Sequence, residues 1–266
     1  KKYRFLIARR FTQLSIIALY ILANIYGINI LMGNLSNSLV LQTVNLSDPF
    51  AVLQMIFAGA IISFDIALGA LIISIFYFIL GGRAFCSWVC PVNIITDSAN
   101  YLRRVLKFDE VQKKQPATRN LRYWLILISF IISYFMGVAA FELISPVSMV
   151  HRGLIFGLGF GLATMIVIFL FDLFVLKNGW CGHICPLGGF YSLIGRFSLL
   201  RVHHNSEKCT ACMKCKVVCP EIQVLHMIDK SSEPVLQECT LCARCIEVCE
   251  DDALNFELRN YMKEKK

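Results

Sequence analysis

The chain contains four long apolar stretches separated by shorter polar segments. They cover residues 11–32, 50–80, 123–144 and 154–176. An α-helix needs about 20 apolar residues to cross the hydrocarbon core of a bilayer. The pattern therefore predicts an α-helical integral membrane protein with four transmembrane helices. Because the second stretch is longer than one crossing, we expect its first part to lie at the membrane interface.

Basic residues flank these stretches and predict their orientation. The first ten residues contain five Lys and Arg, and residues 81–122 contain eight, whereas the loop 33–49 contains none. Lys and Arg in short loops are retained on the cytoplasmic side of a membrane. We therefore expect a multi-pass protein of the bacterial cytoplasmic (inner) membrane, with cytoplasmic N- and C-termini and two short outer loops.

Composition agrees with this prediction and narrows the possible partners. The chain is 57% apolar and only 17% charged, which argues against an ordinary cytosolic enzyme and against disorder. A net charge of +8 is by itself typical of a nucleic-acid-binding protein. The basic excess lies beside the apolar stretches, however, and the chain beyond residue 176 is nearly neutral. We therefore expect contact with membrane lipid and no nucleic-acid partner.

A short cysteine motif occurs twice in the membrane part. FCSWVCP at 85–91 and WCGHICP at 180–186 are offset by 95 residues, and each ends an apolar stretch on the expected inner side. The proline after each motif should stop the transmembrane helix or turn the chain along the membrane surface. We expect two helical hairpins that form parallel repeats about an axis along the membrane normal.

Eight of the twelve cysteines lie in two runs after residue 200. CTACMKCKVVCP and CTLCARCIEVCE both have the spacing C-x2-C-x2-C-x3-C. In bacterial two-cluster ferredoxins three cysteines of such a run hold one [4Fe-4S] cluster and the fourth reaches the other. Disulfides and zinc knuckles fit the repeated four-cysteine spacing less well. We call this exchange of the fourth cysteine between the two runs the crossing. It predicts one cluster on Cys209, Cys212, Cys215 and Cys249, and a second cluster on Cys219, Cys239, Cys242 and Cys245.

The sequence thus predicts two domains, a four-helix membrane domain at 1–200 and a two-cluster ferredoxin-like α+β domain at 201–266. The remaining cysteines belong to the C-x-x-x-C-P motifs: Cys86, Cys90, Cys181 and Cys185. Cysteines four apart share one helix face, with about 5–6 Å between their Cβ atoms. Two interpretations stay open for them. They fill helix-packing space, or they bind an additional iron-sulfur centre where the two repeats meet.

This order of spans, paired FCSWVCP and WCGHICP motifs and a two-cluster tail resembles the NapH family, the membrane ferredoxin-type subunits of periplasmic nitrate reductase systems. It is also similar to NosR-like and CcoG-like proteins, but an outer loop of about 17 residues leaves no room for the flavin-binding domain typical of NosR-like chains. The resemblance to NapH implies a component of a quinol dehydrogenase complex, with quinol as substrate and a NapG-like iron-sulfur protein as partner. The alternatives are a CcoG-like accessory or assembly protein and a passive membrane anchor.

Quinol oxidation releases protons, so ionisable residues in the membrane part are candidates for that step. Four residues qualify: Asp65, Glu142, His151 and Asp172. Each also has a purely structural interpretation. Glu142 could pair with Arg152, and His151 could be a wetted loop residue. Asp172 could cap a helix or pair with Lys177 or Arg83. We expect Asp65 to be the most costly of the four to bury.

Overall fold

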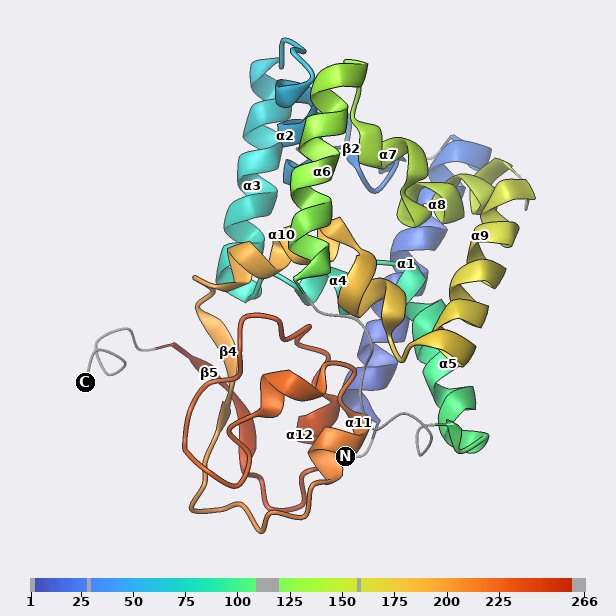
Figure 1. Ribbon diagram of the computed structural model, residues 1–266. Helices are drawn as coiled ribbons and strands as arrows, with labels where there is room; N and C mark the ends of the chain where they lie inside the picture. The colour runs from blue at the N-terminus through green and yellow to red at the C-terminus, as the bar shows by residue number, and fades with distance from the viewer. Residues whose placement is uncertain (1–2, 28–29, 109–119, 157–158, 260–266) are drawn as a thin grey trace. The chain divides into compact units, whose positions relative to one another are not determined.

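The computed structural model describes residues 3–27, 30–108, 120–156 and 159–259 (Figure 1). The chain forms two compact units, and each is assembled from separate parts of the sequence. Unit 1 comprises residues 1–11, 76–89 and 191–266, and unit 2 comprises residues 12–75 and 90–190. The predicted boundary at residue 200 falls inside unit 1, and the division into domains 1–200 and 201–266 stays a prediction.

Helices make up most of the apolar part of the chain. In sequence order they are α1 (Arg4–Tyr26), α2 (Pro49–Phe57), α3 (Phe64–Leu80), α4 (Ala84–Trp88), α5 (Val92–Val105), α6 (Leu121–Met136), α7 (Ala140–Ile144), α8 (Pro146–Phe156), α9 (Gly159–Leu170) and α10 (Pro186–Gly195). Two π-helical turns, η2 (Phe171–Val175) and η3 (Trp180–Ile184), separate α9 from α10. The second apolar stretch is split into α2 and α3, and the interfacial position of its first part stays a prediction.

Only one helix in the described ranges, Arg4–Tyr26, is by itself long and apolar enough to cross a membrane. Three shorter apolar helices occupy the positions of the other predicted spans: Phe64–Leu80, Leu121–Met136 and Gly161–Val175. A helix of 17 residues is about 25 Å long at 1.5 Å per residue, somewhat less than the roughly 30 Å of hydrocarbon in a bilayer. Figure 1 shows the regular courses of α3, α6 and α9.

The apolar helices of unit 2 expose hydrophobic side chains and bury polar ones. On α6, Trp124 and Phe135 are 62% and 80% exposed, whereas Arg122 and Ser133 are completely buried. On α5, Asn100 and Arg103 are buried as well. Water-soluble proteins show the opposite preference for charged residues and large apolar patches.

The predicted outer loop after α1 contains a three-stranded sheet, which was not predicted from the sequence. Strands β1 (Leu31–Gly33), β2 (Asn37–Val40) and β3 (Val44–Ser47) pair antiparallel in the order β1-β2-β3. Gly69 of α3 lies so close to this sheet that a Cβ atom there would overlap the carbonyl of Asn45. The sheet therefore packs directly against α3.

Each C-x-x-x-C-P motif lies on a short helical turn of its own. We expected each motif to end a transmembrane helix, and this detail was wrong. Helix α3 stops at Leu80, and Gly81, with φ +110°, leads into α4, which carries Cys86. Asn178, with φ 50°, similarly separates η2 from η3, which carries Cys181. Left-handed backbone cannot continue an α-helix, so the chain breaks before each motif.

Unit 1 contains the cysteine-rich tail as an α+β fold. Strands β4 (Leu200–His204) and β5 (Leu254–Leu258) pair antiparallel around the short helices α11 (Lys214–Val218), η4 (Ile222–Leu225) and α12 (Arg244–Val248). Its apolar core consists of Val202, Val224, Leu225, Met227, Ile228, Val235, Ala253 and Leu254. The predicted α+β character of the tail is therefore confirmed.

The start of α1 is tied to this tail. The backbone N–H groups of Phe5 and Leu6 donate to Oε1 of Glu247 at 2.6 and 3.3 Å. The Phe5 ring also meets Phe256 edge to face, with 5.8 Å between ring centroids. A carboxylate at a helix N-terminus satisfies free N–H groups and favours the positive end of the helix dipole. The N-terminus and the tail therefore lie in one packed body.

Candidate iron-sulfur site

The two cysteine runs fold into loops with the same backbone shape. The third and fifth residues of each run have positive φ: Ala211 and Met213 at 54° and 59°, and Leu241 and Ala243 at 52° and 58°. A left-handed conformation costs a residue with a side chain about 1–2 kcal/mol. Its recurrence at identical positions indicates that both loops meet the same geometric requirement.

Four thiols from both runs surround one small, largely enclosed cavity. Its wall includes Cys219, Cys239, Cys242 and Cys245. Burial raises the pKa of Cys239 to about 12, and it holds the pKa values of Cys219 and Cys245 well above the usual thiol value. Neighbouring thiols of the same set add to each rise. This is the grouping that the crossing predicts, with Cys219 of the first run joining three cysteines of the second.

The other four thiols form the complementary set. Burial raises the pKa of the Cys215 thiol, and the nearby thiols of Cys209, Cys212 and Cys249 contribute to that rise. Cys249 of the second run therefore lies with the first three cysteines of the first run. Cys215 is buried whereas Cys212 is exposed, so this set reaches the surface of unit 1.

The donor chemistry of both sets fits iron-sulfur clusters. Thiolates are the soft ligands that such clusters require. Ligand thiols lose their protons when a metal binds, so buried thiols with raised pKa values become ligands through binding itself. Leu241 and Ala253 donate backbone N–H groups to the sulfurs of Cys239 and Cys249 at 3.4 and 3.3 Å. A bound [4Fe-4S] cluster would supply one-electron transfer at each set.

The described thiols are not arranged around a single metal ion. Within the described ranges, no three His, Cys, Asp or Glu side chains are placed to hold a single metal ion.

The second cysteine run departs from the first at its last position, where Glu250 stands in the place that Pro220 has in the first run. Glu250 forms an exposed ion pair with Lys214 at 2.7 Å. That departure removes no cysteine from either set.

The first C-x-x-x-C-P motif lies against the loop of the second cysteine run. Ser87 donates through Oγ to the carbonyl of Thr240 at 2.6 Å, and Trp88 donates through Nε1 to that of Leu241 at 3.1 Å. Arg83 donates through Nη1 to the carbonyl of Glu238 at 2.7 Å and to Oε1 of Glu221 at 2.9 Å. From the sequence we expected Arg83 to mark the cytoplasmic side or to pair with Asp172, and its contacts with Glu221 and Glu238 were not predicted.

The second motif is held by other elements of unit 2. Helix α5, which follows Cys90, packs against η2 and η3. Gln13 donates to the Cys90 carbonyl at 3.2 Å, and the backbone N–H of Gly188 points to the Cys185 sulfur at 3.5 Å. The segment after the first motif therefore packs beside η3, which carries Cys181. Cys86 belongs to unit 1, so convergence of all four motif cysteines stays a prediction.

Two of the four predicted proton-handling residues, Glu142 and His151, lie beside polar side chains of α8 and of neighbouring elements, and Glu142 is half-buried. The Glu142 Oε2 atom accepts hydrogen bonds from the hydroxyls of Ser36 and Ser148, both at 2.8 Å. One turn after Ser148 on α8, His151 is only 4% exposed and meets the Tyr20 ring edge to face at 4.8 Å. We name these five residues the outer polar cluster. Burial lowers the pKa of His151, and the neighbouring Arg152 charge lowers it further.

The other two candidates lie elsewhere. Asp65 is exposed in the first turn of α3, where a carboxylate favours the helix dipole. Because Asp65 is exposed within the described part of the chain, the high cost of burying it stays a prediction. Asp172 is fully buried in η2, and its Oδ1 accepts from the backbone N–H of Trp180 at 3.1 Å. This contact agrees with the helix-capping interpretation of Asp172.

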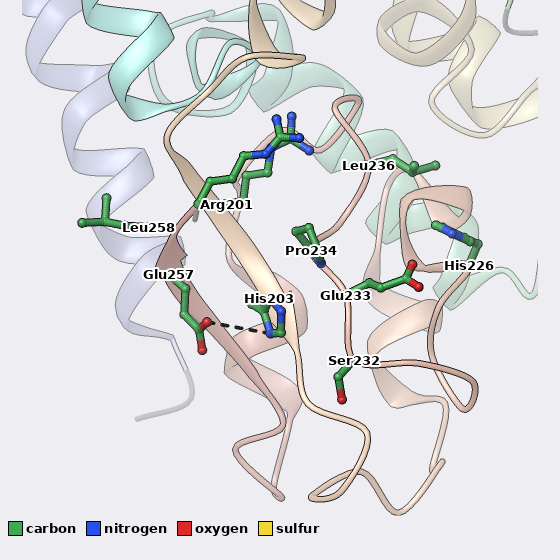
Figure 2. A pocket seen from close by; sticks show the side chains of 10 residues that line it. Arg201, His203, His226, Ser232, Glu233, Pro234, Leu236, Glu257 and Leu258 are labelled. Atoms are coloured by element: carbon green, nitrogen blue, oxygen red, sulfur yellow. Dashed lines mark ion pairs between the residues drawn. The ribbon is translucent and has the colours of Figure 1, made fainter. Parts of the chain in front are cut away.

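The largest open space among the described cavities lies away from every cysteine. It is a groove of ≈ 770 Å³ along β4, β5 and the segment before the second cysteine run. Figure 2 shows His203 facing Glu257, and these side chains form an ion pair at 3.8 Å. No cysteine lines the groove, so its size does not connect it to electron transfer.

Two family models together match most of the chain. A model described as a 4Fe-4S binding domain matches residues 52–109 and 158–203, which include both C-x-x-x-C-P motifs. A model described as a 4Fe-4S dicluster domain matches residues 201–250, which include both cysteine runs. No solved structure matches the chain.

Curated relatives extend over nearly the full length. The ferredoxin-type protein NapH of Haemophilus influenzae is 40% identical over 96% of this chain and 90% of its own length. NapH of Escherichia coli is 38% identical over 97% and 91%. The methylamine utilization ferredoxin-type protein MauN of Paracoccus denitrificans is 41% identical over 84% and 78%. The chain therefore belongs to the NapH family of ferredoxin-type iron-sulfur electron-transfer proteins.

Proposed function

We propose that the chain is a membrane-embedded subunit of a quinol dehydrogenase complex. It oxidises a quinol, which gives up two electrons and two protons to become a quinone. Its two [4Fe-4S] clusters pass the electrons on, one at a time, to a NapG-like iron-sulfur partner of a periplasmic nitrate reductase pathway. The observation that carries the proposal is the gathering of eight thiols into two sets of four in a chain whose helices expose apolar side chains.

A multi-pass position in the inner membrane is supported by what the helices expose. Large apolar side chains cover α3, α6 and α9, whereas Arg122 and Ser133 of α6 point into the protein. Tilting, snorkelling of flanking residues and local thinning of the bilayer let somewhat short helices cross a membrane. We therefore retain four crossings as the proposal.

The proposed cytoplasmic side is supported by the membership of unit 1. It contains the basic residues 1–11 and the tail from residue 191, together with residues 81–89 at the start of the basic middle loop; the rest of that loop belongs to unit 2. Glu247 holds the start of α1 through its first backbone N–H groups. Both termini are therefore proposed to be cytoplasmic, with the β1–β3 sheet on the outer side. Because the nitrate reductase pathway is periplasmic, the tail clusters then either serve a cytoplasmic branch or exchange electrons with a centre at the C-x-x-x-C-P motifs.

The outer polar cluster is the proposed site of proton release from quinol. The lowered pKa keeps the His151 imidazole neutral near pH 7, so it can accept a proton. Its Nε2 atom has no hydrogen-bond partner in the described part of the chain. Glu142 supplies a carboxylate held by two serine hydroxyls. A base and a carboxylate are thus available for the two protons.

Glu142→Gln and His151→Gln are each expected to slow the reduction of the clusters by a quinol analogue by about 10²-fold, the usual effect of losing a proton-transfer group. Asp65→Asn makes the same acid-to-amide change at an exposed helix start and should leave the rate unchanged. Stopped-flow absorbance of the clusters in anaerobic membranes measures all three. If the Glu142→Gln and His151→Gln proteins reduce their iron-sulfur clusters at the wild-type rate, the outer polar cluster is not the site of proton release.

An additional iron-sulfur centre on Cys86, Cys90, Cys181 and Cys185 is also part of the proposal. It is supported by the family model that covers both motifs and by the packing of α5 against η3. Such a centre would raise the iron content above the roughly eight atoms of two [4Fe-4S] clusters. Cys86→Ser should then lower the iron content, and an unchanged iron content would favour the packing interpretation.

A second candidate partner system follows from the MauN relatives. Two MauN relatives are 41% and 40% identical to this chain, close to the 40% and 38% of the NapH proteins, and their names assign them to methylamine utilization. The NapH relatives match a larger share of both chains. Co-purification with a NapG-like protein would favour the nitrate reductase pathway. Co-purification with a methylamine-oxidising enzyme would favour the other.

A further inference from the structure

The segment between α3 and Cys90 is built to receive the loop of the second cysteine run. Arg83, Ser87 and Trp88 donate to three backbone carbonyls on both sides of Cys239, those of Glu238, Thr240 and Leu241, over 2.6 to 3.1 Å. A Cβ atom on Gly81 would overlap the Leu241 side chain. The glycine therefore makes room for Leu241, and the three donors fix the loop.

Arg83 also reaches the other segment that contributes to this set of cysteines. Its guanidinium pairs with Glu221 at 2.9 Å, and Glu221 lies two residues after Cys219. The Arg83 side chain is completely buried, and that of Glu221 is 4% exposed. One buried cation thus connects the residues flanking Cys219 with the residue preceding Cys239.

The other set of cysteines reaches the surface. Cys212 is exposed, and Val217 on the adjacent α11 is 61% exposed. The ion pair near this set, between Lys214 and Glu250, is exposed on both sides. A soluble partner can approach this set directly, whereas the set beside Arg83 faces the segment that carries Cys86.

We propose that the cluster held by Cys219, Cys239, Cys242 and Cys245 is the entry cluster, which receives electrons from the membrane part through the Arg83–Trp88 segment, and that Arg83 sets its reduction potential. The inference rests on the proposed function, because quinol is the electron donor. Electron tunnelling falls steeply with distance, so the cluster that contacts the membrane segment is reduced first. The exposed cluster then passes each electron to the soluble partner.

The effect of Arg83 follows from electrostatics. Reduction adds one negative charge to a cluster, and a buried positive charge nearby stabilises the reduced form. Glu221 acts in the opposite direction. Arg83→Met should therefore lower the potential of the entry cluster, Glu221→Gln should raise it, and the double variant should lie close to the wild type. Arg83 is thus a positioning residue that acts through the loop and through its charge.

Redox titration of the full-length anaerobic protein, followed by electron paramagnetic resonance, tests this inference. The signal that is lost in Cys245→Ser identifies the entry cluster. Arg83→Met is expected to change its ratio of oxidised to reduced form at least tenfold at a fixed potential, which is 59 mV for one electron. Lys214→Met removes an exposed cation beside the other set and should leave the entry cluster unchanged.

Glu221→Gln is expected to shift the reduction potential of the entry cluster in the opposite direction. It keeps the inference testable if the Arg83→Met protein does not assemble its clusters. An entry-cluster potential that is unchanged in Glu221→Gln, or a rise of that potential in Arg83→Met, would overturn the role of Arg83.

The order of reduction is tested by rapid mixing of wild-type membranes with a quinol analogue. The inference is overturned if the exposed cluster is reduced before the entry cluster. Wild-type clusters that quinol does not reduce at all would instead contradict the proposed function.

Discussion

Replacing Cys245 with serine is expected to remove about four iron atoms per chain and one of two [4Fe-4S] signals. Cys245 is buried in the wall of the cavity that it shares with Cys219, Cys239 and Cys242. A serine hydroxyl is a harder and less acidic ligand than a thiol, so it replaces the thiolate poorly. Iron analysis and electron paramagnetic resonance of the anaerobic protein measure the loss.

The matched control is Cys212→Ser, in the other set. It should remove the other signal, because Cys212 is grouped with Cys209, Cys215 and Cys249. If both variants remove the same signal, the crossing between the two runs is wrong. If neither variant lowers the iron content, the tail does not hold clusters through these cysteines.

Arg83→Met is expected to lower the stability of unit 1 by about 3–5 kcal/mol, the usual cost of breaking a buried ion pair on one side. The substitution leaves the Glu221 carboxylate buried without its guanidinium partner and removes a hydrogen bond to the Glu238 carbonyl. The double variant with Glu221→Gln should regain most of this loss, because replacing both charges is often close to neutral. Thermal unfolding in detergent, followed by loss of cluster absorbance, measures the difference.

Lys214→Met is the matched control for stability. Its ion pair with Glu250 is exposed, and exposed pairs contribute only about 0–1 kcal/mol. An Arg83→Met protein that unfolds at the same temperature as Lys214→Met would show that the buried pair does not stabilise unit 1. A double variant as unstable as the single one would point to the lost carbonyl contact as the main cause.

Cysteine spacing was the most informative feature of the sequence. A C-x2-C-x2-C loop has little conformational choice once its thiols share one ligand, so the spacing alone predicts which cysteines gather. The structure places Cys219 with the second run and Cys249 with the first. The repeated positive φ angles at Ala211, Met213, Leu241 and Ala243 show the same constraint in the backbone.

Apolar content predicted where the helices lie but not where they begin. Ile61 and Ile62 are apolar, yet α3 starts only at Phe64, which leaves Asp65 exposed in its first turn. The strands β1–β3 were missed because each has only three or four residues, too few for a clear alternation of apolar and polar positions.

Arg83 could not be identified from local sequence at all. Its partner Glu221 lies 138 residues away, and no spacing rule connects a basic residue after α3 with an acidic residue after Cys219. A basic residue at that position is equally expected from membrane topology. Only the three-dimensional arrangement shows that this cation is buried between two cysteine segments.

The most direct test of the central claim uses wild-type anaerobic membranes that contain the chain. A quinol analogue is added, and cluster reduction is followed by absorbance and electron paramagnetic resonance, with dithionite as the reference for full reduction. Our account predicts that quinol reduces the clusters and that the entry cluster is reduced first. Clusters that dithionite reduces but quinol leaves oxidised would contradict quinol oxidation and favour a passive membrane anchor.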